Sequence, residues 1–216
     1  SSAPGVQLIP STPWLVAADR RQETDLALGV IRTIEALPAH WDFVFVDCPP
    51  LQGYLALAPL SACRHVLVPV EAHILALSGL VSLLDAMDEV RARLNPSLAL
   101  DAILACRVSQ TRHAREVVQR LRGHYPAHML QTVVRENITL AEAPSFQLPI
   151  TRYAPSSQGA KDYRAVAREF LERQRGLDEP AGVSSFASFP DRPDESLAAW
   201  AVAGQPQEPA GLTVSV

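Results

Sequence analysis

An acidic residue at the end of an apolar run is the first group whose type and position could do chemistry. Asp47 follows the run Phe43–Val46 and is followed by Cys48, Pro49 and Pro50. The carboxyl ends of parallel strands are where α/β sheets bind ligands, and a carboxylate there can hold Mg²⁺, usually through water. The prolines restrict the segment that follows. The alternatives are that the Asp47 carboxylate only caps a turn, and that the two prolines only make the chain rigid where it leaves the strand.

A cluster of basic residues is the second candidate. Residues 105–128 contain five arginines and one acid: Arg107, Arg112, Arg115, Arg120, Arg122 and Glu116. If residues 111–125 form a helix, Arg112, Arg115 and Arg122 lie close to one face, and Ala114, Val117, Val118 and Leu121 lie on the opposite, core-facing side. Such a face can bind nucleic-acid phosphates, or it can simply be solvated.

The third candidate is the segment Arg135, Glu136, Asn137, which precedes the short helical pattern of residues 138–143. Asn137 is suited to cap that helix. A phosphate-binding loop is missing from the sequence, because its single lysine, Lys161, stands between Ala160 and Asp162 and no Gly-Lys-Ser/Thr occurs. The three cysteines and six histidines show no metal-ligand spacing.

Alternating strands and helices must position these residues. Continuous apolar runs predict strands over residues 43–47, 65–70 and 98–106, with shorter strands at 6–11 and 131–134. Helical spacing predicts helices over 12–37, 76–94, 111–125 and 159–174. This order predicts an α/β fold with a mostly parallel sheet and helices on both faces.

The charge distribution divides the chain. The net charge is -4 over 216 residues, and the segment 175–216 holds six acids and two bases, whereas residues 1–174 are balanced. We therefore expect a folded domain over residues 1–174 and a disordered, acidic tail rich in Pro, Ala and Ser over 175–216. No apolar run is long enough to predict a transmembrane helix, and the odd cysteine count fits a reducing cytoplasm.

Four blocks in one order resemble a known family. They are "WDFVFVDCPP" (41–50), "VPVEAHILALSGL" (68–80), "VVRENITLAEAPS" (133–145) and "ITRYAPSSQGAKDYRAVAREFL" (150–171). Together they resemble the ParA/Soj partitioning ATPases, relatives of MinD, over about residues 5–173. The resemblance implies a P-loop NTPase-like fold that uses ATP and Mg²⁺.

The resemblance also implies roles at the nucleotide. Asp47 resembles the Walker B carboxylate, which holds Mg²⁺ through water. Cys48, Pro49 and Pro50 resemble the start of the switch segment that senses the γ-phosphate. The segment Arg135–Asn137 resembles the part of the family that lies beside the adenine, so Asn137 could serve there, as a helix cap, or as both.

Partners follow from the same resemblance. The family binds DNA without sequence preference as an ATP-bound homodimer, which points to Arg112, Arg115 and Arg122, and a ParB-like partner stimulates hydrolysis. An arginine that some relatives use just after the position of Ile138 is Thr139 here. The implied setting is the bacterial cytoplasm, at the nucleoid and away from membranes.

The family's P-loop strand is central to the sheet, and its sequence would precede Ser1. We therefore expect residues 1–174 to be the C-terminal portion of a ParA-like domain without its N-terminal strands, with a gap or an exposed edge in the sheet. Alone, such a chain should neither bind ATP tightly nor hydrolyse it. The alternatives are a MinD-like positioning ATPase, which the acidic, Pro-rich tail disfavours, and a scaffold or regulator that lacks a P-loop.

Overall fold

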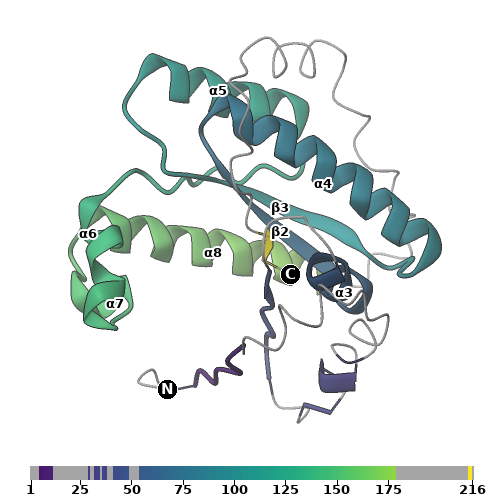
Figure 1. Cartoon of the computed structure of the whole chain (residues 1–216). Helices are drawn as coiled ribbons and strands as arrows, with labels where there is room; N and C mark the ends of the chain where they lie inside the picture. The colour runs from purple at the N-terminus through teal and green to yellow at the C-terminus, as the bar shows by residue number, and fades with distance from the viewer. Residues whose placement is uncertain are drawn as a thin grey trace.

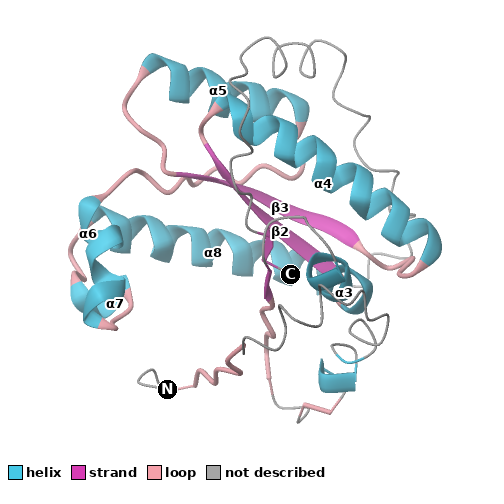
Figure 2. Ribbon diagram, in the orientation of Figure 1, coloured by secondary structure: helices cyan, strands magenta, loops and turns pink. Residues whose placement is uncertain are grey.

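The protein has an α/β architecture in a computed structural model that describes residues 5–11, 29, 32–34, 36–37, 41–48, 54–178 and 214–215. Its sheet contains the strands β1 (Asp47–Cys48), β4 (Val214–Ser215), β2 (His65–Glu71) and β3 (Ala99–Cys106), in that spatial order. β2 and β3 are parallel and paired along their whole lengths, with one irregularity after Val66. The predicted α/β fold with a parallel sheet core is confirmed (Figure 2).

Helices cover both faces of the sheet, as predicted. The long helices α4 (Ile74–Arg93) and α5 (Arg112–His124) lie on one face, and α8 (Gln158–Asp178) lies on the other (Figure 1). The shorter helices are α3 (Tyr54–Ala62), α6 (Ile138–Glu142), the 3-10 turn η1 (Ala143–Phe146) and α7 (Ile150–Tyr153). α7 is a single helical turn that precedes α8.

The strand β3 is apolar at successive positions because both of its faces are covered. Ile103 and Ala105 belong to the core that contains α4 and α5, while Ala102 and Leu104 pack in a second core with Val166 of α8. Side chains on a strand alternate between faces, so a strand between two helical layers must be apolar throughout. This is the physical reason why the continuous runs predicted β2 and β3 correctly.

A segment parallel to β3 takes the place of the short strand predicted at residues 131–134. Isolated bridges pair Ile103 with Met129 and Val108 with Arg135. Between them, the amide of Val134 donates to the carbonyl of Ala105 at 2.9 Å. The segment therefore follows the sheet edge without becoming a regular strand, and it carries the chain towards residues 135–137.

Two sequence predictions near the N-terminus are wrong within the described residues. Residues 6–11 are not a strand, and Leu8 is 78% exposed. The run 43–46 is not a buried strand either, because regular pairing begins at Asp47 and Phe45 is 61% exposed. An apolar run becomes a buried strand only if neighbours cover both of its faces. Here the ring of Phe170 of α8 lies 6.3 Å from that of Phe43 and 6.2 Å from that of Phe45, yet both phenylalanines remain exposed. The helix predicted over 12–37 lies mostly outside the described residues.

The C-terminal region differs from the predicted tail at its two described ends. Helix α8 continues to Asp178, beyond the boundary predicted at residue 174. Val214 and Ser215 form strand β4 inside the sheet, where a disordered tail was predicted. Residues 179–213 lie outside the described residues, and for them the predicted disorder stays a prediction.

Candidate functional site

The predicted site residues lie toward the carboxyl ends of the strands, but not at one level. Ser215 pairs with both Asp47 and Leu67, so Asp47 lies level with Leu67 of β2, four residues before Glu71. β1 and β2 are each antiparallel to β4, so they run parallel to each other. β1 ends with Asp47 and Cys48, β2 with Glu71, and β3 with Cys106. The bridge from Val108 to Arg135 brings the segment 135–137 to the same end of β3. This is the edge at which α/β sheets bind ligands.

Asp47 is exposed and Cys48 is buried, as the alternation of a strand requires. The Cys48 thiol donates to the carbonyl of Val46 at 3.4 Å. Burial, helped by the nearby Cys63 and Asp47, raises the pKa of the Cys48 thiol to about 12. Cys48 is therefore a neutral packing residue, while Asp47 is the group open to a ligand. Pro49 and Pro50 lie outside the described residues.

An ion pair that the sequence interpretation missed joins β2 and β3 at this edge. The guanidinium of Arg107 lies 2.9 Å from the carboxylate of Glu71. Arg107 also has a φ of 47°, in the left-handed region that residues other than glycine rarely adopt. Strained backbone conformations of this kind cluster at functional sites. Opposite charges directly after two neighbouring parallel strands were the signal that could have revealed the pair.

The segment 135–137 is fastened to α8 by one buried carboxylate. Asp162, 4% exposed, accepts the Arg135 guanidinium at 2.5 and 3.1 Å, the Arg135 backbone amide at 3.1 Å and the Gln158 amide at 2.8 Å. Burial on its own would raise the pKa of Asp162, but the hydrogen bonds from Arg135 and Gln158 outweigh it and hold that pKa below its usual value. The side chain of Arg135 is thus engaged in positioning the loop.

Two further residues of α8 continue this row. Glu169 accepts the backbone amides of Gln131 and Thr132 at 2.6 and 2.8 Å, and Arg173 donates to the carbonyls of Asp101 and Ala127 at 2.9 and 2.7 Å. Residues seven and eleven positions after Asp162 lie on the same helix face. A polar row on α8 therefore holds the irregular segment 127–135 along its length.

Asn137 is confirmed as a helix cap. Its side-chain oxygen accepts the backbone amide of Thr139 at 3.0 Å and is the N-cap of α6. The side chain of Glu136 is exposed beside it. This cap fixes where α6 begins and leaves the predicted adenine contact of the segment as a prediction.

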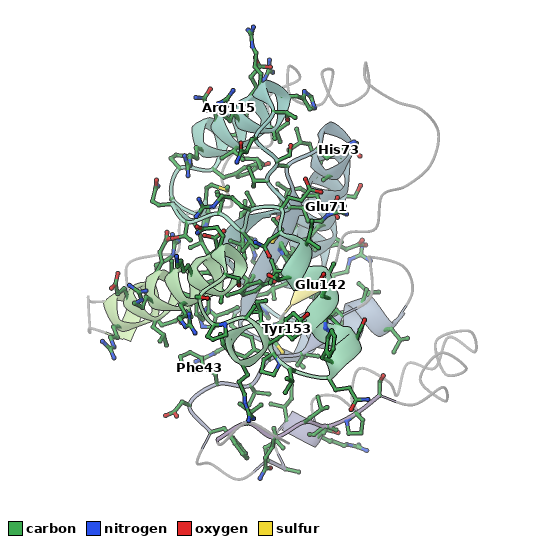
Figure 3. The ribbon with its side chains drawn as sticks, turned by 90° about the vertical axis from the view of Figure 1, so that its left-hand side faces the viewer. Phe43, Glu71, His73, Arg115, Glu142 and Tyr153 are labelled. Atoms are coloured by element: carbon green, nitrogen blue, oxygen red, sulfur yellow. The ribbon has the colours of Figure 1, made fainter. Side chains whose placement is uncertain are left out.

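The arginines of α5 divide into two kinds. The four buried residues of α5 are the predicted Ala114, Val117, Val118 and Leu121, so the predicted core face is confirmed. On the other side Arg115 is exposed, and Figure 3 shows it near the top of the molecule, above Glu71 and His73. Arg112 is 89% exposed and pairs with Glu116 at 2.8 Å, whereas Arg122 donates to the carbonyl of Gln131 at 2.7 Å. Arg112 and Arg115 are thus presented to solvent, and Arg122 is bound to the protein's own backbone.

The donor set fits part of a nucleotide–metal site. In the part of the chain that the structure describes, no group of three or more His, Cys, Asp or Glu side chains could hold a metal ion alone. Mg²⁺ is usually bound through one or two carboxylates together with substrate phosphates, and a single exposed Asp47 fits that mode. The phosphate side does not fit, because the sequence offers no glycine-rich loop with a lysine.

Comparisons with known proteins agree with this architecture. A family model described as an AAA domain matches residues 1–100. The chain is 41% identical over 171 residues to the chromosome-partitioning ATPase Soj of Thermus thermophilus, covering 78% of this chain and 67% of that protein. It is 33% identical over 171 residues to the chromosome partitioning protein ParA of Myxococcus xanthus, covering 78% and 60% respectively. The chain thus spans roughly three fifths to two thirds of the length of these relatives.

Solved structures share the fold. The cobyrinic acid a,c-diamide synthase of Mycobacterium smegmatis, solved with ADP and magnesium, matches with a TM-score of 0.63 at 24% identity, covering 78% of this chain and 63% of that one. The cell division ATPase MinD of Pyrococcus furiosus matches with a TM-score of 0.53 at 18% identity, covering 70% and 59%. The fold is therefore that of P-loop ATPases related to MinD. The chain belongs to the ParA/MinD family, together with the partitioning ATPases ParA and Soj. Among the described residues, no helix has the length and apolar character needed to cross a bilayer.

Proposed function

We propose that this chain is part of a ParA-type partitioning ATPase, which binds ATP and Mg²⁺, binds DNA without sequence preference as an ATP-bound homodimer, and hydrolyses ATP when a ParB-like partner stimulates it. The single observation that supports this most is the position of Asp47. It is an exposed carboxylate in the two-residue strand β1, in a chain 41% identical to Soj.

Residues of this chain would serve two sides of the nucleotide. Asp47 would hold the metal ion through water, and the bound metal would neutralise charge on the phosphates. The segment 135–137, fixed by Asp162 and by the Asn137 cap, would present backbone groups to the base. Residues 1–216 contain no phosphate loop, so they would not supply the phosphate side of the site.

DNA binding would fall to the exposed arginines of α5. Arg112 and Arg115 project into solvent from the first turns of the helix, and α5 carries one acid, Glu116, among its residues. Contacts between arginine and phosphate oxygens carry no base information and weaken with salt. Arg122 contributes less to this proposal, because its guanidinium already donates to Gln131.

The test uses the product of the complete coding sequence that contains these residues. Arg112→Ala with Arg115→Ala should weaken ATP-dependent DNA binding and lower the slope of log affinity against log salt by about 2, since each phosphate contact contributes about 0.9. Arg168→Ala with Arg175→Ala removes the same charge from exposed positions on α8, across the sheet, and should change binding little. Equal losses in the two double variants would defeat the proposed DNA face.

A further inference from the structure

The chain leaves β3 through a β-bulge. Beside the end of β3, the amide of Val134 donates to the carbonyl of Ala105 at 2.9 Å, and its carbonyl accepts the amide of Val108 at 3.1 Å. A regular parallel ladder has one residue between two such partners, but here two residues, Cys106 and Arg107, lie between them. The extra residue is a bulge, and Arg107 accommodates it in the left-handed region, with a φ of 47°.

The bulge turns the side chain of Arg107 toward β2. Glu71, which is the last residue of β2 and is labelled in Figure 3, has Cys106 as its register partner. Register partners point to the same face of a sheet, and the next residue along a regular strand points to the opposite face. A regular strand would therefore direct Arg107 away from Glu71, whereas in the bulge its guanidinium lies 2.9 Å from the Glu71 carboxylate. The left-handed backbone makes the ion pair possible, and the ion pair in turn stabilises that backbone.

The bulge also sets the register of the segment 135–137. Directly after it, the carbonyl of Val108 accepts the amide of Glu136 at 3.2 Å, and Val108 is the bridge partner of Arg135. Because a bulge adds a residue to only one of two paired segments, every later pairing shifts by one position. The segment 135–137 therefore takes its place along β3 from the conformation of Arg107.

We infer that Arg107 is a positioning residue for the segment 135–137, and that its ion pair with Glu71 couples this segment to the end of β2. The left-handed backbone is costly for a residue other than glycine, and the ion pair offsets part of that cost. Both side chains are open to solvent, at 67% and 48% exposed, so the pair should change the local equilibrium by about two- to fivefold. The consequence for the nucleotide rests on the proposed function, in which this segment lies beside the base.

Amide hydrogen exchange, measured by mass spectrometry without nucleotide on the product of the complete coding sequence, tests the positioning role. Arg107→Gln and Glu71→Gln each remove the ion pair, whereas Arg107→Lys keeps it, since the pair uses a single guanidinium nitrogen. The two glutamine variants should exchange about two- to fivefold faster in peptides that cover residues 133–137, and Arg107→Lys should exchange like the parent chain. Peptides that cover residues 128–131, which join β3 before the bulge, are the internal folding control.

The steady-state kinetics of the same product separate positioning from a loss of stability. In Arg107→Gln the KM for ATP should rise by about two- to fivefold, while kcat changes by less than about twofold, because the segment would contact the base and not the transferred phosphate. Arg107→Lys should restore the KM. A loss of stability alone would lower the active fraction, and with it kcat, and would leave the KM unchanged.

The matched control is Arg93→Gln, which breaks the exposed ion pair between Arg93 and Glu89 at 3.2 Å in α4 and should change neither readout. Unchanged exchange at residues 133–137 in both glutamine variants overturns the inference, and so does equal exchange in Arg107→Lys and Arg107→Gln. Faster exchange with an unchanged KM supports the positioning role and contradicts the proposed contact with the base. Because the exchange readout needs no nucleotide, it decides the inference even if the complete product does not hydrolyse ATP.

Discussion

Replacing Asp162 with alanine tests how α8 positions the loop at residues 135–137. The buried carboxylate accepts hydrogen bonds from the Arg135 backbone amide, the Arg135 guanidinium and Gln158. Its removal leaves those donors without their acceptor. The guanidinium is half exposed and can return to water, so its share of the lost stability is small, about 0.2–1 kcal/mol.

The remaining loss comes from the two amide donors. A hydrogen bond to a charged group contributes about 1.5–3 kcal/mol, and a donor left without a partner at a partly buried site costs a comparable amount. Since contributions in one network are not additive, we expect Asp162→Ala to lower the free energy of unfolding by about 2–4 kcal/mol in total. For a domain of this size that corresponds to a fall in Tm of roughly 5–15 °C.

Urea unfolding followed by circular dichroism measures the global loss, and hydrogen exchange at residues 131–137 measures the local one. The matched control is Glu172→Ala, which removes an exposed carboxylate from the same helix and should change the free energy of unfolding by less than about 0.5 kcal/mol. If the two variants unfold at the same urea concentration and exchange alike at 131–137, the positioning role of Asp162 is refuted.

Three further outcomes follow from the same structure. Hydrogen bonds outweigh burial and lower the pKa values of Asp162 and Glu169. The two carboxylates therefore stabilise the fold above the ordinary carboxyl pKa values, and this stabilisation is lost as the pH falls below about 4.5. Urea titrations should show that the free energy of unfolding changes less between pH 7 and pH 3 in Asp162→Asn/Glu169→Gln than in the parent chain. Burial raises the pKa values of Cys48 and Cys106 to about 12 and about 11, so iodoacetamide at pH 8 should modify the native thiols far more slowly than the unfolded ones, and equal rates by mass spectrometry would contradict this. Purified residues 1–216 should show no measurable ATP turnover in a phosphate-release assay, because they contain no phosphate loop.

The parts of the fold that the sequence predicted are those decided by local periodicity. The runs that became β2 and β3 are apolar because both faces are covered, and the face of α5 that became buried follows from helical spacing alone. The cap at Asn137 was predictable for the same reason, since its partner lies two residues away.

The parts that the sequence did not reveal depend on distant partners. Asp162 contacts a residue 27 positions away, and nothing in its own helix indicates that its carboxylate is buried. The run at 43–46 has the composition of a buried strand, yet its exposure depends on which neighbours flank it. β4 is a still stronger case, because two residues of the acidic tail become a strand only where β1 and β2 leave room for them.

The most direct test of the account is the ATPase activity of the complete coding product with Asp47→Ala, compared with Asp42→Ala. Both positions are exposed acids on either side of the same apolar run, but only Asp47 lies in a strand of the sheet. Loss of a group that orients a metal ion typically lowers activity by about 10–100-fold. The account predicts a Mg²⁺-dependent hydrolysis rate that falls by that amount in Asp47→Ala and is retained in Asp42→Ala. Full activity in Asp47→Ala would contradict it.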